Sequence, residues 1–518
     1  MASTVPAVSF SLHFGTGGIR ALMGEGPNRL NEGTVAVATQ GVSRWLLATI
    51  DAPHVVIARD CREHGEEFVA MASGVFAGNG IEVTDIGAAP TPMLSFAVRD
   101  LGCDLGLVLT ASHNARDYNG YKVYGPDGCQ GTTQMCGEIA REISRVAEVK
   151  LGDSEPDGMP AGLKDRYLDA LVNAVPGPRI GGIRIAYSPL NGTGWSLVPE
   201  ILRSNGFAVD VVFEQSQLDG RFPTCPYPNP EDADAILRVE RLAKRKKCHV
   251  ALATDPDADR VGVSVLHNEY MVSLSGDEVG ELLLDWVCRM HSDGGEDVSG
   301  RIAVSTVVTS AALDAICAKW GLLLRRTLTG FKFVGEQIGL LESQGRAEEF
   351  LLGIEESLGY LSGAYVRDKD GVQGCLMVAR MAAWYAERGT DLVDALANLR
   401  AEIGWNIKSQ ISLSFDDGEQ MKLLMTRLRE SERNEIAGRA VMERVDYLGS
   451  APMPGDANQT LPSSDVLQWD LEDGSRLIIR PSGTEPKVKA YCFGYGKNEV
   501  QARVMRGRLE VAAHEMLA

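Results

Sequence analysis

One stretch of the chain places a serine and a histidine directly after a buried apolar run. The run, residues 105–109, predicts a strand, and Thr110-Ala111-Ser112-His113-Asn114 follows it. Ligands in open α/β sheets gather at the carboxyl ends of strands, so Ser112 is a candidate nucleophile if a base or a metal assists it. Asn119-Gly120 predicts a turn that would bring Lys122 back toward Ser112. The alternative is a serine that only turns the chain.

Three aspartates at alternate positions form a second candidate site. Residues 249–254 predict a strand, and Asp255-Pro256-Asp257-Ala258-Asp259-Arg260 follows it. Mg²⁺ prefers such oxygen ligands. An EF-hand, which also begins with spaced acids, needs Gly at the sixth position and Glu at the twelfth, where this chain has Arg260 and Leu266. The alternative is an acidic turn exposed to solvent.

Four further stretches carry polar groups with less specific spacing. Phe14-Gly15-Thr16-Gly17-Gly18-Ile19-Arg20 lets backbone N–H groups and Arg20 approach an anion, although it lacks the ending of a Walker loop. Glu355-Glu356-Ser357, after a predicted strand at 350–354, suits hydrogen bonds to sugar hydroxyls or is an exposed acidic turn. Residues 480–489 combine one arginine, two hydroxyls, a glycine and two lysines, a composition that suits a phosphate or a basic turn. Lys369, judged alone, lies in a surface turn.

Length and composition favour a globular protein of three or four domains. The 518 residues are 44% hydrophobic and carry a net charge of −19, which disfavours nucleic acid but not an anionic small substrate. No apolar run reaches about 18 residues, so we expect no membrane span. The N-terminus lacks a signal-peptide pattern, and ten scattered cysteines suggest reduced thiols, so we expect a cytoplasmic protein.

These motifs lie on alternating strands and helices, which predict an α/β fold in several domains. Helices are expected at 66–77, 195–204, 311–320, 419–432 and 499–517, and strands also at 55–58, 183–187, 302–308 and 476–480. Their composition predicts a linker at residues 291–300 and a long loop at residues 449–465. The predicted domains are 1–173, 178–292, 298–404 and 405–518. No repeat period is visible; the first three domains share only the order strand, loop, helix.

Four motifs in this order carry a family resemblance. Thr110 to Asn114, Asp255 to Arg260, Gly353 to Ser357 and Arg480-Pro481-Ser482-Gly483-Thr484 together resemble the α-D-phosphohexomutase superfamily, which includes phosphoglucomutases and phosphomannomutases. The resemblance covers most of the chain, from about Phe14 to Tyr491. Phe14 to Arg20 and Thr329-Gly330-Phe331-Lys332 are most similar to the phosphoglucomutase branch with phosphopentomutase-like members.

The resemblance implies four domains around a central cleft, three mixed-sheet α/β units and a smaller C-terminal α+β domain. It also implies a phosphoserine at Ser112, and Mg²⁺ held by Asp255, Asp257, Asp259 and the group on Ser112. Residues implied to line the reacting site are Arg20, His113, Lys122, Arg260 and Lys369. Residues implied to bind substrate are Thr329, Gly330, Lys332, Glu355, Ser357, Arg480, Ser482, Gly483, Thr484 and Lys489.

The implied activity is a phosphosugar mutase that interconverts the 1- and 6-phosphates of glucose or mannose through a bisphosphorylated sugar, which also serves as activator. The partner is then a phosphorylated monosaccharide, with Lys122 or Lys369 as base and His113 in support. Alternatives are a phosphopentomutase, a glucose-1,6-bisphosphate synthase with the same site, or a silent sugar-phosphate-binding protein. Two departures from the family pattern are Ala115 in place of a proline, which concerns loop stiffness, and Tyr360 near the place of a histidine. The sequence carries no signal of oligomeric state.

Overall fold

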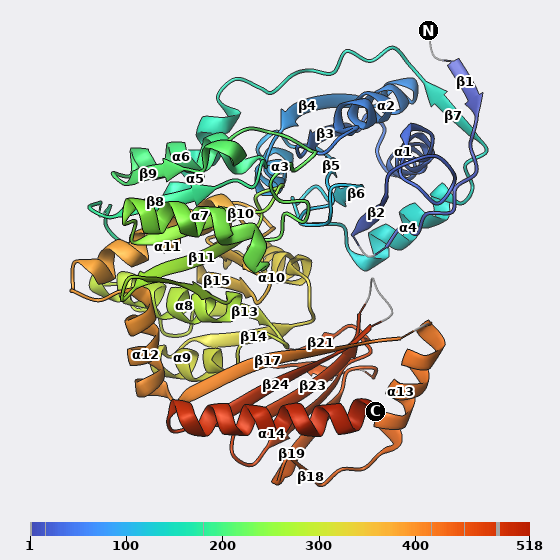
Figure 1. Ribbon diagram of the computed structural model, residues 1–518. Helices are drawn as coiled ribbons and strands as arrows, with labels where there is room; N and C mark the ends of the chain where they lie inside the picture. Colours follow the sequence, from blue (N-terminus) through green and yellow to red (C-terminus); the bar gives the residue numbers. More distant parts are fainter. Residues whose placement is uncertain (1–2, 16, 180, 416, 450, 483–486) are drawn as a thin grey trace. The chain divides into compact units, whose positions relative to one another are not determined.

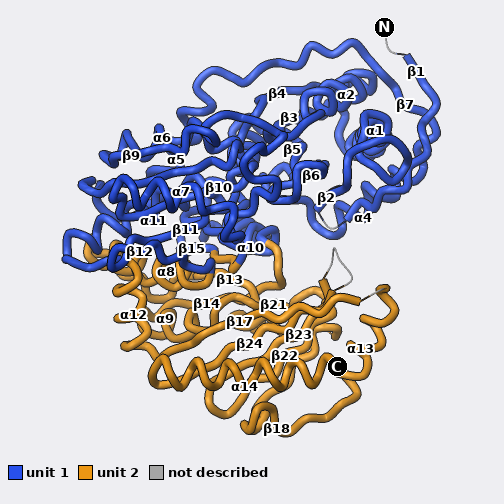
Figure 2. The backbone as a smooth tube through the Cα atoms, in the orientation of Figure 1, with its two compact units in different colours: residues 1–276, 331–353, 357–391 blue, residues 277–330, 354–356, 392–518 orange. Residues whose placement is uncertain are grey.

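The computed structural model describes residues 3–15, 17–179, 181–415, 417–449, 451–482 and 487–518. The chain divides into two compact units, which Figure 2 shows in different colours. Unit 1 comprises residues 1–276, 331–353 and 357–391, and unit 2 comprises residues 277–330, 354–356 and 392–518. The third predicted domain, 298–404, is divided between the two units, because the chain passes from unit 2 back to unit 1 at residue 331 and again at residue 357.

A mixed five-stranded sheet organises the first part of unit 1 (Figure 1). Its order is β2-β6-β5-β3-β4, in which β5, β3 and β4 are parallel and β6 and β2 are antiparallel additions. Apolar β-branched and leucine residues make β3 and β5 buried strands, as parallel central strands require. The elements are β1 (Ser3–Pro6), β2 (Gly18–Leu22), α1 (Glu32–Leu47), β3 (His54–Arg59), α2 (Gly65–Gly78), β4 (Glu82–Ala88), α3 (Thr91–Asp100), β5 (Leu105–Leu109), β6 (Tyr118–Tyr124), α4 (Thr133–Ile143), β7 (Glu148–Leu151) and α5 (Leu163–Ala174).

A second five-stranded sheet in unit 1 repeats the order of four of these strands, but its outer strand β12 follows β11 in the chain, whereas β2 precedes β3. Its order is β12-β11-β10-β8-β9, with β10, β8 and β9 parallel and β11 and β12 antiparallel. Helix α7 packs on β8 and β10 through the buried apolar face that its sequence pattern supplies (Figure 1). The elements are β8 (Arg184–Ser188), α6 (Gly194–Ser204), β9 (Ala208–Val211), the 3₁₀ turn η1 (Phe213–Gln215), α7 (Ala233–Lys246), β10 (Val250–Thr254), β11 (Val261–His267) and β12 (Tyr270–Leu274).

Unit 1 is completed by later parts of the chain. Helix α11 is buried along nearly its whole length and packs against α6 and β16. Its N-cap is Asp370, whose Oδ1 accepts the N–H of Gln373 at 2.9 Å. These later elements are α10 (Phe331–Ser343), the 3₁₀ turn η2 (Ala347–Glu349), β15 (Phe350–Glu355), which ends in unit 2, β16 (Gly359–Ser362) and α11 (Gly371–Ala386).

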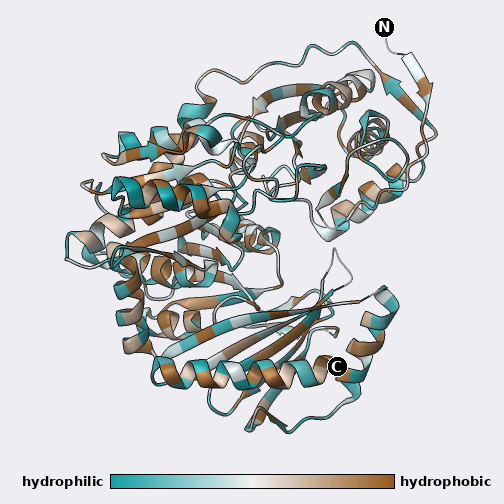
Figure 3. Cartoon of the chain, in the orientation of Figure 1, coloured by the Kyte–Doolittle hydropathy of each residue, from teal (hydrophilic) through white to brown (hydrophobic). Residues whose placement is uncertain are grey.

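Unit 2 combines a parallel strand pair, β13 and β14, with a six-stranded antiparallel sheet of order β17-β24-β23-β22-β19-β18. Helix α14 packs across β24 and β17, and Figure 3 shows hydrophilic and hydrophobic residues alternating along it. The elements are α8 (Gly276–Asp293), β13 (Ile302–Thr306), α9 (Ala312–Trp320), β14 (Leu323–Thr327), α12 (Leu392–Ile403), β17 (Trp405–Ser414), α13 (Gly418–Glu430), β18 (Glu435–Ile436), β19 (Arg439–Asp446), β20 (Ala451–Met453), β21 (Asp456–Leu461), β22 (Leu467–Leu471), β23 (Arg476–Pro481), β24 (Lys487–Gly496) and α14 (Glu499–Leu517).

Most expected helices and strands occur with ends shifted by one or two residues, but three predictions are wrong. Asn119-Gly120 lies inside β6 and makes no turn; Gly120 is there because a Cβ would lie 2.3 Å from the carbonyl oxygen of Thr110. The predicted linker at 291–300 begins inside α8, which continues to Asp293. The predicted loop at 449–465 contains the hairpin of β20 and β21.

All ten cysteines are buried and free. Burial raises the pKa of several of these thiols, that of Cys103 to about 12, so they behave as apolar core residues. None of the helices in the described ranges is both long enough and apolar enough to cross a membrane.

The β20–β21 hairpin packs tightly on β14 within unit 2. The N–H of Arg326 donates to the carbonyl of Pro454 at 2.9 Å, and Arg325 forms an ion pair with Asp456 at 2.8 Å. Gly455 has φ +89°, and a Cβ there would lie 1.8 Å from the carbonyl oxygen of Leu324. This position therefore needs glycine both for its backbone conformation and for close approach.

We expect Gly455→Ala to destabilise unit 2 more than Gly438→Ala. Both glycines have positive φ, but a Cβ at Gly438 meets nothing within 4 Å. Gly438→Ala should therefore lower the free energy of unfolding only through its strained backbone, by about 1–2 kcal/mol. Overpacking against β14 should add about 1–3 kcal/mol for Gly455→Ala. Urea denaturation of both variants measures the difference, and equal losses of stability would contradict the packing argument.

Candidate functional site

The Ser112 loop leads from β5 to β6 and brings the serine against an acidic residue of the second sheet. Ser112 is buried and has φ +50°. Its Oγ donates to Asp255 Oδ2 at 2.7 Å and lies 3.2 Å from His113 Nδ1. Two motifs separated by 143 residues in sequence therefore meet through one hydrogen bond.

The three aspartates occupy the turn from β10 to β11 and are all buried. One carboxylate oxygen from each lies within 4.8 Å of the others. Asp255 Oδ1 accepts the N–H groups of Asp259 and Arg260, at 3.2 and 3.1 Å. The Oδ1 atoms of Asp257 and Asp259 are buried with no hydrogen-bond partner in the described part of the chain. Such a set of converging oxygens fits a hard divalent cation.

Two lysines flank this acidic cluster. Lys122, from β6, lies 3.1 Å from Asp257 Oδ2, and Lys369, from the loop before α11, lies 2.8 Å from Asp259 Oδ2. Lys369 also contacts Asp368 at 3.4 Å, and only 11% of its side chain is exposed, so it does not lie in a surface turn. The structure thus brings Lys122 to the cluster along a strand and not through the expected turn.

The carboxylates differ in their proton affinities. Burial raises the pKa of Asp255 well above its ordinary value, and the charges of Asp259 and Asp257 raise it further. Burial also acts to raise the pKa of Asp257, but Lys122, the hydrogen bond with Asp255 and Lys369 lower it. Asp255 therefore binds a proton more readily than Asp257 does.

Two arginines also lie near the Ser112 loop and the acidic cluster. Arg20, on β2, donates to Asn114 Oδ1 at 2.8 Å, and Arg260 lies 3.8 Å from Asp259. Desolvation lowers the pKa of His113 well below its ordinary value, and Arg260 and Arg20 lower it further. His113 is therefore a neutral imidazole at neutral pH, next to two cations that suit an anionic group on Ser112.

Sequence reasoning missed three residues that hold this site together. Asp60 and Arg62, directly after β3, contact the Ser112 loop, and Thr91, at the start of α3, donates to Asp257 Oδ2 at 3.1 Å. Only their place in the chain could have indicated this role, because each residue comes shortly after the carboxyl end of a strand in the same sheet as β5. Their residue types alone do not distinguish them from ordinary turn and cap residues.

The residues expected to bind sugar are divided between the two units. Thr329, Gly330 and Glu355 belong to unit 2, whereas Lys332 and Ser357 belong to unit 1. Glu355 is buried at the end of β15. Lys332 Nζ lies 3.3 Å from Thr133 Oγ1, at the start of α4. Their role in binding stays a prediction.

Two of the expected phosphate-binding residues, Arg480 and Lys489, lie on the β23–β24 strand pair of unit 2. Arg480 and Lys489 are directly opposite each other, so their side chains lie on one face of the sheet. Arg480 donates to the Tyr491 hydroxyl at 3.0 Å, and the N–H of Ser482 donates to Lys487 at 2.7 Å. Gly483 and Thr484 lie outside the described residues.

Comparison with known proteins agrees with this geometry. Residues 11–150, 165–268, 275–402 and 425–508 match the four families described as phosphoglucomutase/phosphomannomutase alpha/beta/alpha domains I, II and III and C-terminal domain. A phosphoglucomutase of Staphylococcus aureus (strain USA300) is 32% identical over 498 residues, which cover 93% of this chain and 89% of that protein.

Solved structures share the fold. Parafusin, a phosphoglucomutase from Paramecium, superposes with a TM-score of 0.75 at 18% identity, covering 100% of this chain and 96% of that one. A phosphoglucomutase/phosphomannomutase family protein from Burkholderia thailandensis gives 0.73 at 20% identity, covering 97% and 96%. With all four domain families present in order, the chain belongs to the α-D-phosphohexomutase superfamily of phosphosugar mutases.

Proposed function

We propose that this enzyme interconverts the 1-phosphate and 6-phosphate of glucose, mannose or both, with Ser112 as the phosphoryl carrier. The observation that supports it most directly is the 2.7 Å contact between Ser112 Oγ and Asp255 within a buried cluster of three carboxylates. Phosphoryl transfer depends mainly on positioning and on neutralising charge, and this cluster offers both. The matches favour this class over a phosphopentomutase, a bisphosphate synthase or a non-catalytic binding protein.

The cofactor in this proposal is Mg²⁺, held by Asp255, Asp257 and Asp259 together with an oxygen of the group on Ser112. The partnerless Oδ1 atoms of Asp257 and Asp259 support this assignment. When bound, the ion neutralises negative charge on the transferring phosphoryl group. A sugar bisphosphate acts as activator by phosphorylating Ser112.

In the first half-reaction, the free hydroxyl of the sugar monophosphate attacks the phosphorus on Ser112. The new phosphorus–oxygen bond to the sugar forms as the bond to Ser112 Oγ breaks. Lys122 or Lys369 takes the proton of the attacking hydroxyl, and this proton ends on Ser112 Oγ, which becomes a free hydroxyl again. Arg20 and Arg260 bind the phosphoryl oxygens. Each lysine is held beside the cluster by an ion pair with one of its carboxylates.

In the second half-reaction, the bisphosphate turns so that its other phosphate returns to Ser112 and the isomerised monophosphate leaves. One set of residues must then hold whichever phosphate is not reacting. We assign this role to Arg480, Ser482, Gly483, Thr484 and Lys489, because Arg480 and Lys489 place two cations on one face. Thr329, Gly330, Lys332, Glu355 and Ser357 are assigned to the sugar.

We expect Ser112→Ala to lose mutase turnover and to carry no phosphate, while its thermal stability stays near that of the wild type. The substitution removes the only atom that forms the covalent intermediate. Intact-protein mass spectrometry measures the phosphate, and a coupled assay measures turnover.

The matched control is Ser73→Ala, because Ser73 Oγ is buried with no hydrogen-bond partner among the residues described. It should keep wild-type activity and phosphate. Loss of the wild-type phosphate upon addition of glucose 1-phosphate or mannose 1-phosphate identifies the sugar. Near-wild-type turnover in Ser112→Ala would remove the nucleophile assignment.

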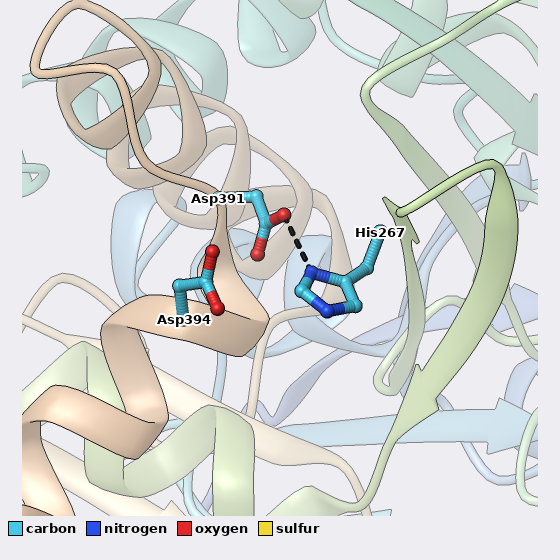
Figure 4. Close-up of side chains that lie close together, drawn as sticks. All are labelled: His267, Asp391 and Asp394. Carbon is cyan, nitrogen blue, oxygen red and sulfur yellow. Dashed lines mark hydrogen bonds and ion pairs between the residues drawn. The ribbon is translucent and has the colours of Figure 1, made fainter.

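We expect chelation with EDTA to stop turnover and added Mg²⁺ to restore it. Asp257→Asn should raise the Mg²⁺ concentration for half-maximal activity by at least about tenfold, because it removes a charged ligand. The control is Asp391→Asn, which alters another partly buried carboxylate, hydrogen-bonded to His267 Nδ1 at 2.8 Å (Figure 4). Equal Mg²⁺ dependence in both variants would contradict the assigned ligands.

We expect Arg480→Gln to raise KM for the sugar monophosphate about tenfold or more and to change kcat less, because it removes a charge that binds the non-reacting phosphate. Steady-state kinetics measure both constants. Arg439→Gln, which breaks a half-exposed ion pair with Asp473, is the control and should leave KM unchanged. An unchanged KM in Arg480→Gln would show that this arginine does not bind substrate.

A further inference from the structure

A buried arginine outside the assigned catalytic residues gathers the carbonyl groups of the Ser112 loop. Arg62 Nη2 donates to the carbonyls of Ser112 and Asn114, both at 2.6 Å. Its Nη1 donates to the carbonyls of Ala115 and Tyr118, at 2.8 and 2.7 Å. With Nε bonded to Asp60 Oδ2 at 3.1 Å, all five N–H groups of this guanidinium have acceptors.

Asp60 extends the same network to the other side of Ser112. Its Oδ1 accepts the N–H of Arg62 at 2.9 Å, and its Oδ2 accepts the hydroxyl of Thr110 at 2.6 Å. Thr110 Oγ1 in turn accepts the N–H of Ser112 at 2.8 Å. Both backbone polar groups of Ser112 are therefore fixed by the Asp60–Arg62 pair, its carbonyl directly and its N–H through Thr110.

The second sheet's part of unit 1 closes over this pair. The ring of Phe222, which is fully buried, lies 5.4 Å from the Arg62 guanidinium carbon. A Cβ at Gly220 would lie 2.4 Å from the carbonyl oxygen of Cys61, so the loop around Gly220 rests directly on the turn between Asp60 and Arg62. The loop that carries Ser112 and the part of the chain that carries Asp255 are thus joined at Arg62.

We propose that Arg62 is the positioning residue of the reactive serine: it holds the Ser112 loop rigid on one guanidinium, with Asp60 and Phe222 holding the guanidinium itself. The proposal rests on the proposed role of Ser112 in phosphoryl transfer. Arg62 contacts no aspartate of the Asp255–Asp259 cluster, so it acts through the loop.

The test is Arg62→Lys, which keeps the positive charge but cannot reach five acceptors. We expect kcat to fall about 10- to 100-fold, because a displacement of about 1 Å at reacting atoms has effects of this size. KM for the sugar phosphate should change less than about twofold, since ground-state binding is untouched. Amide hydrogen exchange of residues 112–118 should accelerate.

The control is Arg380→Lys, which alters another buried arginine of unit 1, bonded to the carbonyl of Val175 at 2.8 Å and to Asn205 at 2.9 Å. It should lower thermal stability and leave kcat and the exchange of residues 112–118 unchanged. If Arg62→Lys resembles this control, or raises KM as much as it lowers kcat, the positioning role is overturned.

If Arg62→Lys does not fold, Phe222→Leu provides a second test. Leucine keeps the buried side chain apolar and removes only the aromatic ring over the guanidinium. Exchange of residues 112–118 should again accelerate and kcat should fall at unchanged KM; if neither changes, the proposal fails. Absence of mutase activity in the wild-type enzyme would overturn the proposed function instead, and the exchange measurement would still decide whether Arg62 holds the loop.

Discussion

The structure of unit 1 depends on keeping three carboxylates buried within 4.8 Å of one another. Burial disfavours each charge and mutual repulsion disfavours them further, so neighbouring cations must offset these terms. Lys122 and Lys369 supply two of the cations, from β6 and from the loop before α11. The need to bring these groups together explains why strands and loops far apart in sequence end at one place.

The local sequence was sufficient to predict the acidic turn and the serine loop. Leu105 to Leu109 and Val250 to Thr254 are short apolar runs, and polar residues that follow such runs lie at strand ends. The positions of Lys122 and Lys369 could not be predicted from spacing. Gly120 suggested a turn because glycine is common in turns, but glycine is also needed where two backbone segments approach closely. Only the position of the Thr110 carbonyl shows that the second reason applies here.

The same limit applies to Arg62 and to the β20–β21 hairpin. Arg62 is recognisable only by its acceptors, which are backbone carbonyls that any residues would provide. The hairpin has few apolar residues in alternation, and its stability comes from packing on β14 through Gly455 and Asp456. Non-local backbone contacts of this kind leave little trace in composition or periodicity.

The two sheets of unit 1 also explain why the serine faces the aspartates. In each, three neighbouring parallel strands are followed by an antiparallel strand, and the connection is the β5–β6 loop in one and the β10–β11 turn in the other. Ser112 and Ala258, in these two connections, both have φ +50°, and Leu358, between β15 and β16, has φ +63°. A residue in the left-handed region reverses the chain sharply and so leaves the flanking polar side chains at the strand ends. Ser112, the acidic cluster and the predicted sugar loop thus occupy the same kind of connection. This structural repeat has no visible sequence period, because only backbone geometry is repeated.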